Sequence, residues 1–532
     1  MKEKRDESEI EREIPEYSDI VDLMGRWGYL QKKLVMFLFF FGFPNCWNNL
    51  GLTFMAPKIN YWCSSNLNIS DEDWKKYMLP KEERDGKLTY SQCRMYDIPL
   101  NNSNSSDEIE CHRWHYDLDF YHSTIIEKWD LVCDKAWFTS LSQTLYFSGF
   151  FVSMFICGQL SDRFGRKRIS LLCVIGAGIS GVTCMLSPTY ILFAASRFFI
   201  AFFRSGSYIC MYVLVMECVG KEYRSHVGLI QKYGWATAYI ILPAIVWLVR
   251  DWFYIQLIAT LPFFLLLSIY WLVPESPRWL LSQNRLEEAE TILKRCLKEN
   301  NVKVENLREI VLFLSEKIKN EMGDKRKRRA NILDLFKTPN MRKKTLILCY
   351  AWFSSAFGYY GLSLNANEIG GHPLLYFFFS GLVEFPAATI GMLLIKYIGR
   401  RKPQVGFLIS SGIICILAAV VPSNLLELRI FFAVMAKLCV SASFLIIYIF
   451  SSEIYPTVIR NVGMGTSSMC ARIGTLVVPF LKELGEIVHQ ALPLTLLGTF
   501  SITSGFLVLL LPETLHTHLP DTLAEGEQFG RI

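Results

Sequence analysis

Long apolar segments alternate with short charged ones along most of the chain. Segments of about 18 to 25 apolar residues are typical of membrane-spanning helices, because a helix of that length crosses the hydrocarbon core of a bilayer. We predict one spanning helix in each of twelve such segments. They cover residues 34–55, 140–160, 169–188, 190–216, 226–249, 254–273, 345–364, 374–396, 405–421, 428–450, 463–482 and 490–511.

Basic residues gather in alternate loops between these segments. They occur in RFGRKR at 163–168, in KEYR at 221–224, across 278–344 and in GRRK at 399–402. Alternate loops lie on one side of a membrane, and Lys and Arg favour the cytosolic side. We therefore expect these loops and both ends of the chain to be cytosolic.

The loop between the first two predicted helices, residues 57–138, should then be extracellular. It contains four cysteines and three N-glycosylation sequons, which together indicate an oxidising, glycosylating compartment. The cysteines are Cys63, Cys93, Cys111 and Cys133, and the sequons begin at Asn68, Asn101 and Asn104. We predict two disulfides, for which three pairings are open. The loop is also our candidate surface for a homo-oligomer.

Composition agrees with a lipid bilayer as the surroundings of the chain. With 52% hydrophobic residues, the chain has more apolar surface than a soluble domain of its size would bury. No Walker, HExxH, GxSxG or paired-cysteine ligand motif occurs, so we expect neither an enzyme nor a bound cofactor or metal. The basic run KRKRR at 325–329 lies beside membrane spans, where it indicates topology and anionic lipid rather than nucleic-acid binding.

Three charged motifs occur twice, in the same order and at nearly the same separation. GRKR at 165–168 matches GRRK at 399–402, Glu217 and Arg224 match Glu453 and Arg460, and PES at 274–276 matches PET at 512–514. Such internal repetition is typical of transporters built from two related halves.

The charged residues of these repeated loops are candidates for a cytosolic gate. Ion pairs at the ends of two bundles can hold one face closed and release it when the halves rock. The candidates are Asp162, Arg163, Arg166, Glu217, Arg224 and Glu275 in the first half, and Arg400, Glu453, Arg460 and Glu513 in the second.

We therefore predict an all-α membrane protein with twelve transmembrane helices in two pseudo-symmetric six-helix bundles. The predicted divisions are a cytosolic N-terminal segment (1–33), a first bundle (34–273) that includes the extracellular loop domain (57–138), a cytosolic linker with amphipathic helices (274–344), a second bundle (345–511) and a cytosolic tail (512–532).

Several of these motifs are similar to those of a known family. GQLSDRFGRKR at 158–168 resembles the signature loop of the major facilitator superfamily. PESPRWLL at 274–281, SSEIYPTVIRNVGMG at 451–465 and LPETLHTHLPDT at 511–522 resemble the organic cation, carnitine (zwitterion) and organic anion transporter family within it. This resemblance implies alternating access and polyspecific transport of small charged organic molecules across the plasma membrane.

Ionisable residues inside the predicted helices are the first candidates for substrate binding. Burying such a side chain in a membrane is costly unless it meets water, a partner or a ligand. The candidates are Glu384, Arg472, Lys437 and Arg204. The alternative is a buried structural pair.

The same positions bear on the charge of the substrate. Cation transporters of the family typically have an acid where this chain has Arg472, whereas anion and carnitine-type members have arginine there. Glu384 resembles the helix-eight acid of the cation and carnitine-type branches. One acid and one guanidinium fit a zwitterion, whose ammonium could lie near Glu384 while its carboxylate binds Arg472.

A carnitine-like or amino-acid-like zwitterion, or an organic cation, moved by facilitated diffusion or exchange, is thus the preferred interpretation. An organic anion exchanger is the alternative, because bases outnumber the acid Glu384. A non-transporting membrane receptor or scaffold is the alternative of another class. Arg204 should repel sodium, whereas proton coupling through Glu384 stays open.

Aromatic residues complete the candidate substrate site. Rings bind organic ions of differing shape through cation–π and stacking contacts, although most aromatic residues simply pack. The candidates are Trp235, Trp352, Tyr359, Phe444 and Tyr448. The family pattern implies that an aromatic residue at Tyr359 lies against the substrate.

Overall fold

The computed structural model describes residues 19–64, 70–84, 87–97, 108–304, 306–327, 331–366, 372–422 and 424–530. Within these ranges the chain is mostly helical, and one to three consecutive helices occupy each of the twelve predicted spans. The sequons at Asn68, Asn101 and Asn104 lie outside the described residues.

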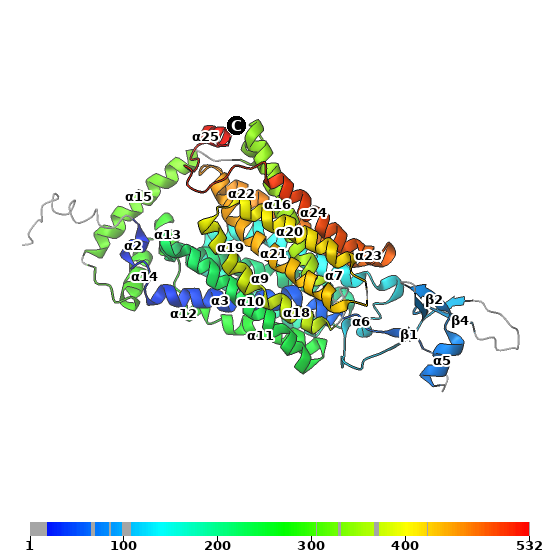
Figure 1. Cartoon of the computed structure of the whole chain (residues 1–532). Coiled ribbons are helices and arrows are strands. Elements are labelled where there is room, and N and C mark those ends of the chain that lie inside the picture. Colours follow the sequence, from blue (N-terminus) through cyan, green and yellow to red (C-terminus); the bar gives the residue numbers. More distant parts are fainter. Residues whose placement is uncertain are drawn as a thin grey trace, which may run out of the picture.

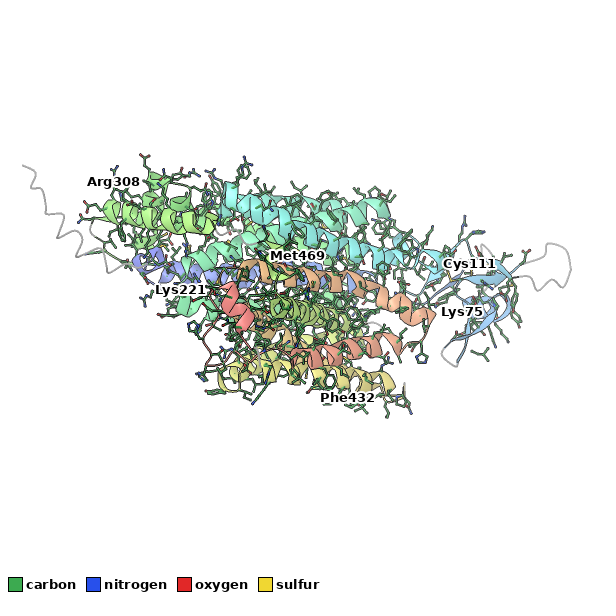
Figure 2. The ribbon with its side chains drawn as sticks, turned by 90° about the horizontal axis from the view of Figure 1, so that it is seen from above. Lys75, Cys111, Lys221, Arg308, Phe432 and Met469 are labelled. Carbon is green, nitrogen blue, oxygen red and sulfur yellow. A yellow bond between two sulfur atoms is a disulfide. The ribbon has the colours of Figure 1, made fainter. Side chains whose placement is uncertain are left out.

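The spanning helices form two lobes, which are coloured blue to green and yellow-green to red in Figure 1 and lie beside one another in Figure 2. The first lobe contains α3 (Tyr29–Leu50), α7 (Phe138–Phe164), α8 (Arg166–Met185), α9 (Tyr190–Cys218), α10 (Arg224–Val249), α11 (Trp252–Leu266) and the short α4 (Leu52–Met55) and α12 (Ile269–Leu272). The second contains α16 (Pro339–Leu364), α18 (Pro373–Leu382), α19 (Glu384–Tyr397), α20 (Arg401–Val420), α21 (Leu426–Ile454), α22 (Arg460–Val477), η5 (Val478–Phe480), α23 (Leu481–Ile487) and α24 (Leu492–Val508).

Eight helical segments of the described chain are long and apolar enough to cross a membrane, and α24 is apolar but shorter. In a bilayer, helices associate through close packing rather than through burial from water, so small residues mark their contacts. Gly42 of α3 and Gly234 of α10 show this, because a Cβ on Gly42 would lie 2.6 Å from the backbone of Gly234. These features make the chain a multi-pass membrane protein.

The described residues between 57 and 137 form a small loop domain at one end of the lobes (Figure 1). Its strands pair as three two-stranded antiparallel sheets, β1–β6, β2–β3 and β4–β5. The elements are β1 (Tyr61–Cys63), α5 (Asp71–Met78), β2 (Lys81–Arg84), β3 (Lys87–Tyr90), β4 (Arg94–Tyr96), β5 (Glu108–Glu110), β6 (Trp114–Tyr116), α6 (Ile125–Lys128) and η2 (Cys133–Lys135). Disulfides join Cys63 to Cys111 and Cys93 to Cys133, which selects one of the three possible pairings.

The opposite end carries the linker helices and both ends of the described chain; Arg308 marks it in Figure 2, and Lys75 and Cys111 mark the loop domain. We call the two ends the linker end and the loop-domain end. The elements at the linker end are α2 (Ile20–Leu23), η3 (Lys221–Tyr223), α13 (Pro277–Ser282), α14 (Leu286–Glu299), α15 (Leu307–Lys327), η4 (Ile332–Leu335) and α25 (Leu523–Gln528). Helix α14 is amphipathic, as predicted for the linker: Ala289, Leu293 and Cys296 lie on one face of it and are buried.

The two lobes contact each other at the loop-domain end. Ser140 Oγ of α7 donates a hydrogen bond of 3.0 Å to the carbonyl oxygen of Pro479, and Thr144 Oγ1 donates one of 3.2 Å to that of Leu476. The rings of Phe54 and Phe377, also from opposite lobes, lie 4.6 Å apart. These contacts close the interface at this level.

Toward the linker end the same two helices separate. Gly158 lies five helical turns beyond Ser140 on the same face of α7, and Gly465 lies about two turns from Arg472 on α22. Neither glycine has a heavy atom within 4 Å of where a Cβ would stand. The interface between the lobes is therefore open at the linker end.

Candidate substrate-binding site and gate

The carboxylate of Glu384 lies in the interior of the second lobe, at the first residue of α19. Pro386 follows two residues later and has no N–H to continue the helix, which accounts for the break between α18 and α19. The break gives Glu384 the first turn of a helix, where the dipole favours a negative charge. Its side chain is fully buried.

Each oxygen of Glu384 faces its own partners. Oε1 accepts a hydrogen bond of 2.9 Å from Ser441 Oγ and lies 3.7 Å from Lys437 Nζ. Oε2 lies 3.1 Å from Lys232 Nζ. Such pairing offsets part of the cost of burying these charges, and removing one partner would leave the other uncompensated.

The ammonium of Lys437 is fixed within the second lobe. It donates to the carbonyl oxygen of Tyr359 at 3.0 Å and to Ser363 Oγ. It also lies 3.2 Å from the centre of the Tyr359 ring, a cation–π contact. Lys437 is fully buried, so its ammonium contacts Tyr359 and Glu384 and does not reach into open space.

Two side chains of α10 reach across from the first lobe to the same cluster. Lys232 pairs with Glu384, and Trp235 Nε1 donates a hydrogen bond of 2.8 Å to Tyr359 Oη. Trp235 was expected from the sequence, whereas Lys232 was not. The sequence feature that could have identified Lys232 is its position inside the predicted span 226–249, where any ionisable residue is a functional candidate.

Arg204 and Arg472 form a second charged group, one from each lobe. Their guanidinium groups lie 5.2 Å and 4.0 Å from the centre of the Phe150 ring. Arg204 donates to Asn45 Oδ1, while its Nε and Nη2, like Nε of Arg472, have no hydrogen-bond partner among the described residues. Both side chains are more than nine-tenths buried.

Bases therefore outnumber acids in the interior. Glu384 is the one acid that the described residues bring to this level, against Lys232, Lys437, Arg204 and Arg472. Uncompensated charge in a low-dielectric interior is unfavourable, so a bound anionic group would stabilise the cluster.

The predicted aromatic residues divide into exposed and buried ones. Tyr448 is 40% exposed, and Phe444, partly buried, links it to Tyr359 with ring separations of 5.8 Å on each side. Trp352 is fully buried, with Nε1 bonded to Ser451 Oγ at 2.8 Å and its ring 4.3 Å from Tyr448. Trp352 thus supports Tyr448 from behind instead of lining open space.

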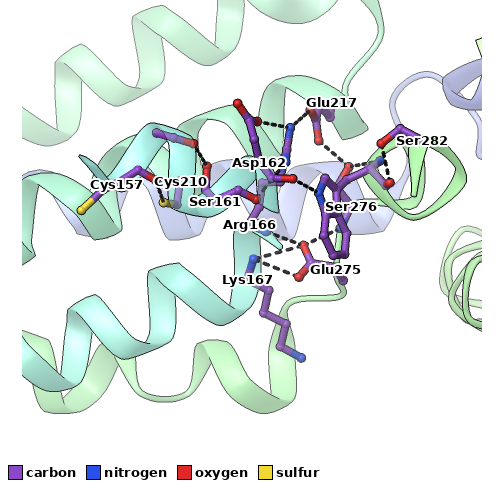
Figure 3. A network of polar contacts seen from close by, with 12 residues as sticks. Cys157, Ser161, Asp162, Arg166, Lys167, Cys210, Glu217, Glu275, Ser276 and Ser282 are labelled. Atoms are coloured by element: carbon purple, nitrogen blue, oxygen red, sulfur yellow. Dashed lines mark hydrogen bonds and ion pairs between the residues drawn. The ribbon is translucent and has the colours of Figure 1, made fainter. Parts of the chain in front are cut away.

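Most of the predicted gate residues of the first lobe meet around Arg166 at the linker end (Figure 3). Its guanidinium pairs with Asp162 at 2.8 Å and with Glu217 at 3.2 Å. Its backbone N–H donates to Glu275 Oε1 at 3.1 Å, and Ser276 Oγ donates to Glu217.

The second lobe repeats this arrangement around Arg400. The guanidinium pairs with Glu453 at 2.9 Å, and the backbone N–H donates to Glu513 Oε1 at 2.8 Å. Thr514 Oγ1 donates to Glu453, as Ser276 does to Glu217. The internal repetition of the sequence is therefore also a repetition of contacts.

Three of the predicted gate residues do not join these networks. Arg163 is exposed and lies over the ring of Phe164, and Arg460 donates to the carbonyl oxygen of Tyr455 and to Thr457. Arg224 forms no ion pair with Glu217, which is occupied by Arg166 and Ser276. Both networks lie within a lobe, consistent with an interface that is open at the linker end.

A cavity of about 1050 Å³ lies at the opposite end, beneath the loop domain. Residues of the loop domain and of both lobes line it, including Trp114, Asn365 and His489. The contacts of Ser140 and of Phe54 with the second lobe separate this cavity from the charged interior. It is distinct from the predicted site.

Comparison with known proteins agrees with this architecture. The family model described as "Sugar (and other) transporter" matches residues 86–521. The inward-open xylose transporter XylE from E. coli superposes with a TM-score of 0.62 over 94% of this chain and 98% of its own, at 16% sequence identity. XylE bound to 6-bromo-6-deoxy-D-glucose gives a TM-score of 0.57 with the same coverage.

Proteins related by sequence share a higher identity with this chain than XylE does. The organic cation transporter protein of Drosophila melanogaster is 34% identical over 97% of this chain and 95% of its own length. Solute carrier family 22 member 3 of Rattus norvegicus is 32% identical over 97% and 96%, and organic cation/carnitine transporter 2 of Homo sapiens is 31% identical over 96% and 93%. The chain therefore belongs to the sugar (and other) transporter family and, within the major facilitator superfamily, to the group of organic cation and carnitine transporters.

Proposed function

We propose that this protein carries small organic ions across the plasma membrane by alternating access, and that zwitterions bearing an ammonium and a carboxylate are its preferred substrates. Carnitine-like and amino-acid-like molecules have this chemistry. The single observation that carries the proposal is the presence of both signs of charge in one interior: Glu384 pairs with Lys437 beside Tyr359, and Arg204 and Arg472, which have unpartnered donors, lie around Phe150.

Adjacent aromatic residues connect the two charged groups. Tyr359 contacts Lys437, which pairs with Glu384, and its neighbour Tyr360 interacts with Arg472. The two rings lie 5.2 Å apart. A small molecule beside them could place its ammonium near Glu384 and its carboxylate against Arg472, because cation–π and bidentate contacts favour these groups. The names of the relatives, which include a carnitine transporter, support the same class.

Transport would follow from the contacts between the lobes. The loop-domain end is closed by Ser140 and Thr144, and the linker end is open around Gly158 and Gly465. Rocking of the lobes about the charged interior would exchange these states and expose the substrate to the other side. The excess of Lys and Arg at the linker end supports a cytosolic location for that end and for both termini.

The loop domain is accordingly assigned to the outside of the cell. Its two disulfides fit an oxidising compartment, and the sequons at Asn68, Asn101 and Asn104 are proposed glycosylation sites there. We also propose it as the surface through which copies of the chain would associate.

An organic anion exchanger is the second candidate. The specific observation in its favour is that both oxygens of Glu384 already face lysines, while Arg204 and Arg472 have free donors. A substrate with a carboxylate but no ammonium would use those donors equally well.

Uptake into proteoliposomes distinguishes the two candidates. Labelled carnitine and labelled succinate would be the tracers in separate runs, with β-alanine and propionate as competitors, each tested with and without sodium. A zwitterion carrier takes up carnitine and is inhibited more strongly by β-alanine than by propionate, which lacks the ammonium group. Uptake of succinate without uptake of carnitine would support the anion exchanger, and uptake of neither tracer would refute both.

A further inference from the structure

We propose that Lys232 acts as a built-in competitor of the substrate: its ammonium occupies the site on Glu384 that a substrate ammonium would use, and substrate binding must displace it. The inference rests on the proposed function only in assigning Glu384 to the ammonium group of the substrate.

The surroundings of Lys232 Nζ are those of an ammonium-binding site. It lies 3.1 Å from Oε2 of Glu384 and 5.2 Å from the centre of the Tyr359 ring. A carboxylate oxygen combined with an aromatic face is the environment that proteins use to recognise ammonium ions. The first lobe thus places a cation of its own into a site built by the second lobe.

The two lysines beside Glu384 differ in their attachment. Lys437 belongs to the same lobe as Glu384, is fully buried and has its own bonds to Tyr359 and Ser363, so it stays in place when the lobes move. Lys232 comes from the other lobe and is 20% exposed. It faces Oε2, the oxygen that neither Ser441 nor Lys437 occupies.

Lys232 also lies at the edge of the opening between the lobes. Gly228, one helical turn nearer the linker end on the same face of α10, has open space where a Cβ would stand. A ligand entering from the linker end therefore reaches Lys232 before it reaches Glu384. The flexible lysine stem can swing into this space and release Oε2.

Displacement reduces the apparent affinity. For a ligand that binds only when its site is vacant, the apparent dissociation constant is the intrinsic one divided by the vacant fraction, so a site that Lys232 fills nine-tenths of the time binds about tenfold more weakly. Lys232 also joins the lobes through Glu384, so its displacement breaks an ion pair in the middle of the interface.

Binding of tetramethylammonium to the purified full chain in lipid nanodiscs tests the proposal, because this cation has no carboxylate for the arginines. Lys232→Gln should bind it about tenfold more tightly than the wild type, the change expected when a site that is nine-tenths occupied is vacated. Lys232→Arg, which keeps the charge, should resemble the wild type. Lys396→Gln, which removes an exposed lysine from the helix that carries Glu384, should also bind tetramethylammonium like the wild type. Equal or weaker binding by Lys232→Gln would overturn the proposal.

A second measurement uses the wild-type chain and does not depend on the folding of a variant. Acetylation of Lys232 by an N-hydroxysuccinimide ester, followed by mass spectrometry, should increase several-fold when tetramethylammonium is added, because the displaced ammonium enters open space. An unchanged or reduced rate would contradict displacement. Carnitine uptake is scored separately, so failure of the proposed function and failure of this inference give different patterns.

Discussion

Arg204 and Arg472 lie over the same ring, that of Phe150, although they belong to opposite lobes. Two guanidinium groups around one ring repel each other, and the ring compensates only part of that repulsion. A carboxylate bound between them would offset one of the two positive charges and draw the lobes together. If substrate binds here, the pair would link occupation of the site to the relative position of the lobes.

Replacing Arg472 by glutamine should weaken carnitine binding about 10- to 100-fold, because a hydrogen bond to a charged group contributes about 1.5–3 kcal/mol. Calorimetry on the purified chain measures this effect. Tetramethylammonium, which needs no guanidinium, should bind as before or more tightly. Arg472→Lys keeps the charge but lacks the planar guanidinium, so its carnitine affinity should lie between those of the wild type and Arg472→Gln. Unchanged carnitine affinity in Arg472→Gln would exclude Arg472 from the site.

The spans were predictable because a bilayer imposes a length and an apolar composition that few other structures share. The predicted span 226–249 differs from α10 by two residues at one end. Predicted and observed helix ends differ more where a helix extends beyond its apolar part. Helix α16, for example, begins at Pro339 and includes the basic residues that precede the predicted start at 345. The networks of Arg166 and Arg400 were predictable from the internal repetition, which places the same residue types at the same helix ends.

The orientation of individual side chains was harder to predict. Trp352 and Tyr448 both lie on interior helices, and hydropathy does not tell which faces open space and which faces protein. Lys232 was not predicted because it lies in the first half of α10, where a lysine stem can carry its ammonium toward the polar end of the helix. The state of the interface, open at the linker end, leaves no trace in the pattern of apolar residues, because both states use the same helices.

A tryptophan at Gly158 should stop transport while leaving substrate binding intact. The present conformation has room for a large side chain there, since no heavy atom lies within 4 Å of where a Cβ would stand. Gly158 shares a face with Ser140, so the other lobe should approach it when the linker end closes. Carnitine uptake should fall at least tenfold in Gly158→Trp, with calorimetric affinity within about threefold of the wild type.

The matched control for this experiment is Gly158→Ala, whose small side chain should allow closure and normal uptake. A tryptophan at Gly406, which also has open space but lies on α20, away from the contacts between the lobes, should be tolerated as well. Normal uptake by Gly158→Trp would show that the linker end does not close at this level.

Gly165 and Gly399 should each resist replacement by alanine. Both have positive φ angles, +107° and +110°, in a region that only glycine occupies readily. A Cβ would also lie 2.6 Å from Glu275 Oε2 in the first case and 2.8 Å from the carboxyl group of Glu513 in the second. Each alanine variant should lose about 1–3 kcal/mol of stability, seen as a lower Tm in detergent.

Gly465→Ala is the comparison for these variants, because Gly465 is helical and has open space around it. Alanine there should be neutral or stabilising by about 0.5–1 kcal/mol, since it restricts the unfolded chain. If Gly165→Ala or Gly399→Ala matched Gly465→Ala in Tm, the tight turn before Arg166 and Arg400 would not depend on glycine.

Glu513 should make the stability of the second lobe depend on acid pH. Burial alone would raise the pKa of its carboxyl group, but four backbone N–H groups bond to the ionised form and bring the pKa below its ordinary value of 4.5. These donors belong to Arg400, Arg401, Thr514 and Leu515. Since the folded-state pKa is the lower one, the stabilisation is complete above 4.5 and is lost as the pH falls through the folded value.

The difference in Tm between the wild type and Glu513→Gln measures this contribution. It should be constant between pH 6 and 8 and shrink below about pH 4.5, because the protonated glutamic acid then resembles glutamine. Glu427→Gln, which makes the same change at an exposed residue in the first turn of α21, should leave the Tm nearly unchanged at every pH. A Glu513 difference that stayed constant down to pH 3, or that grew as the pH fell, would mean that the ionised carboxylate is not what holds the turn before α20.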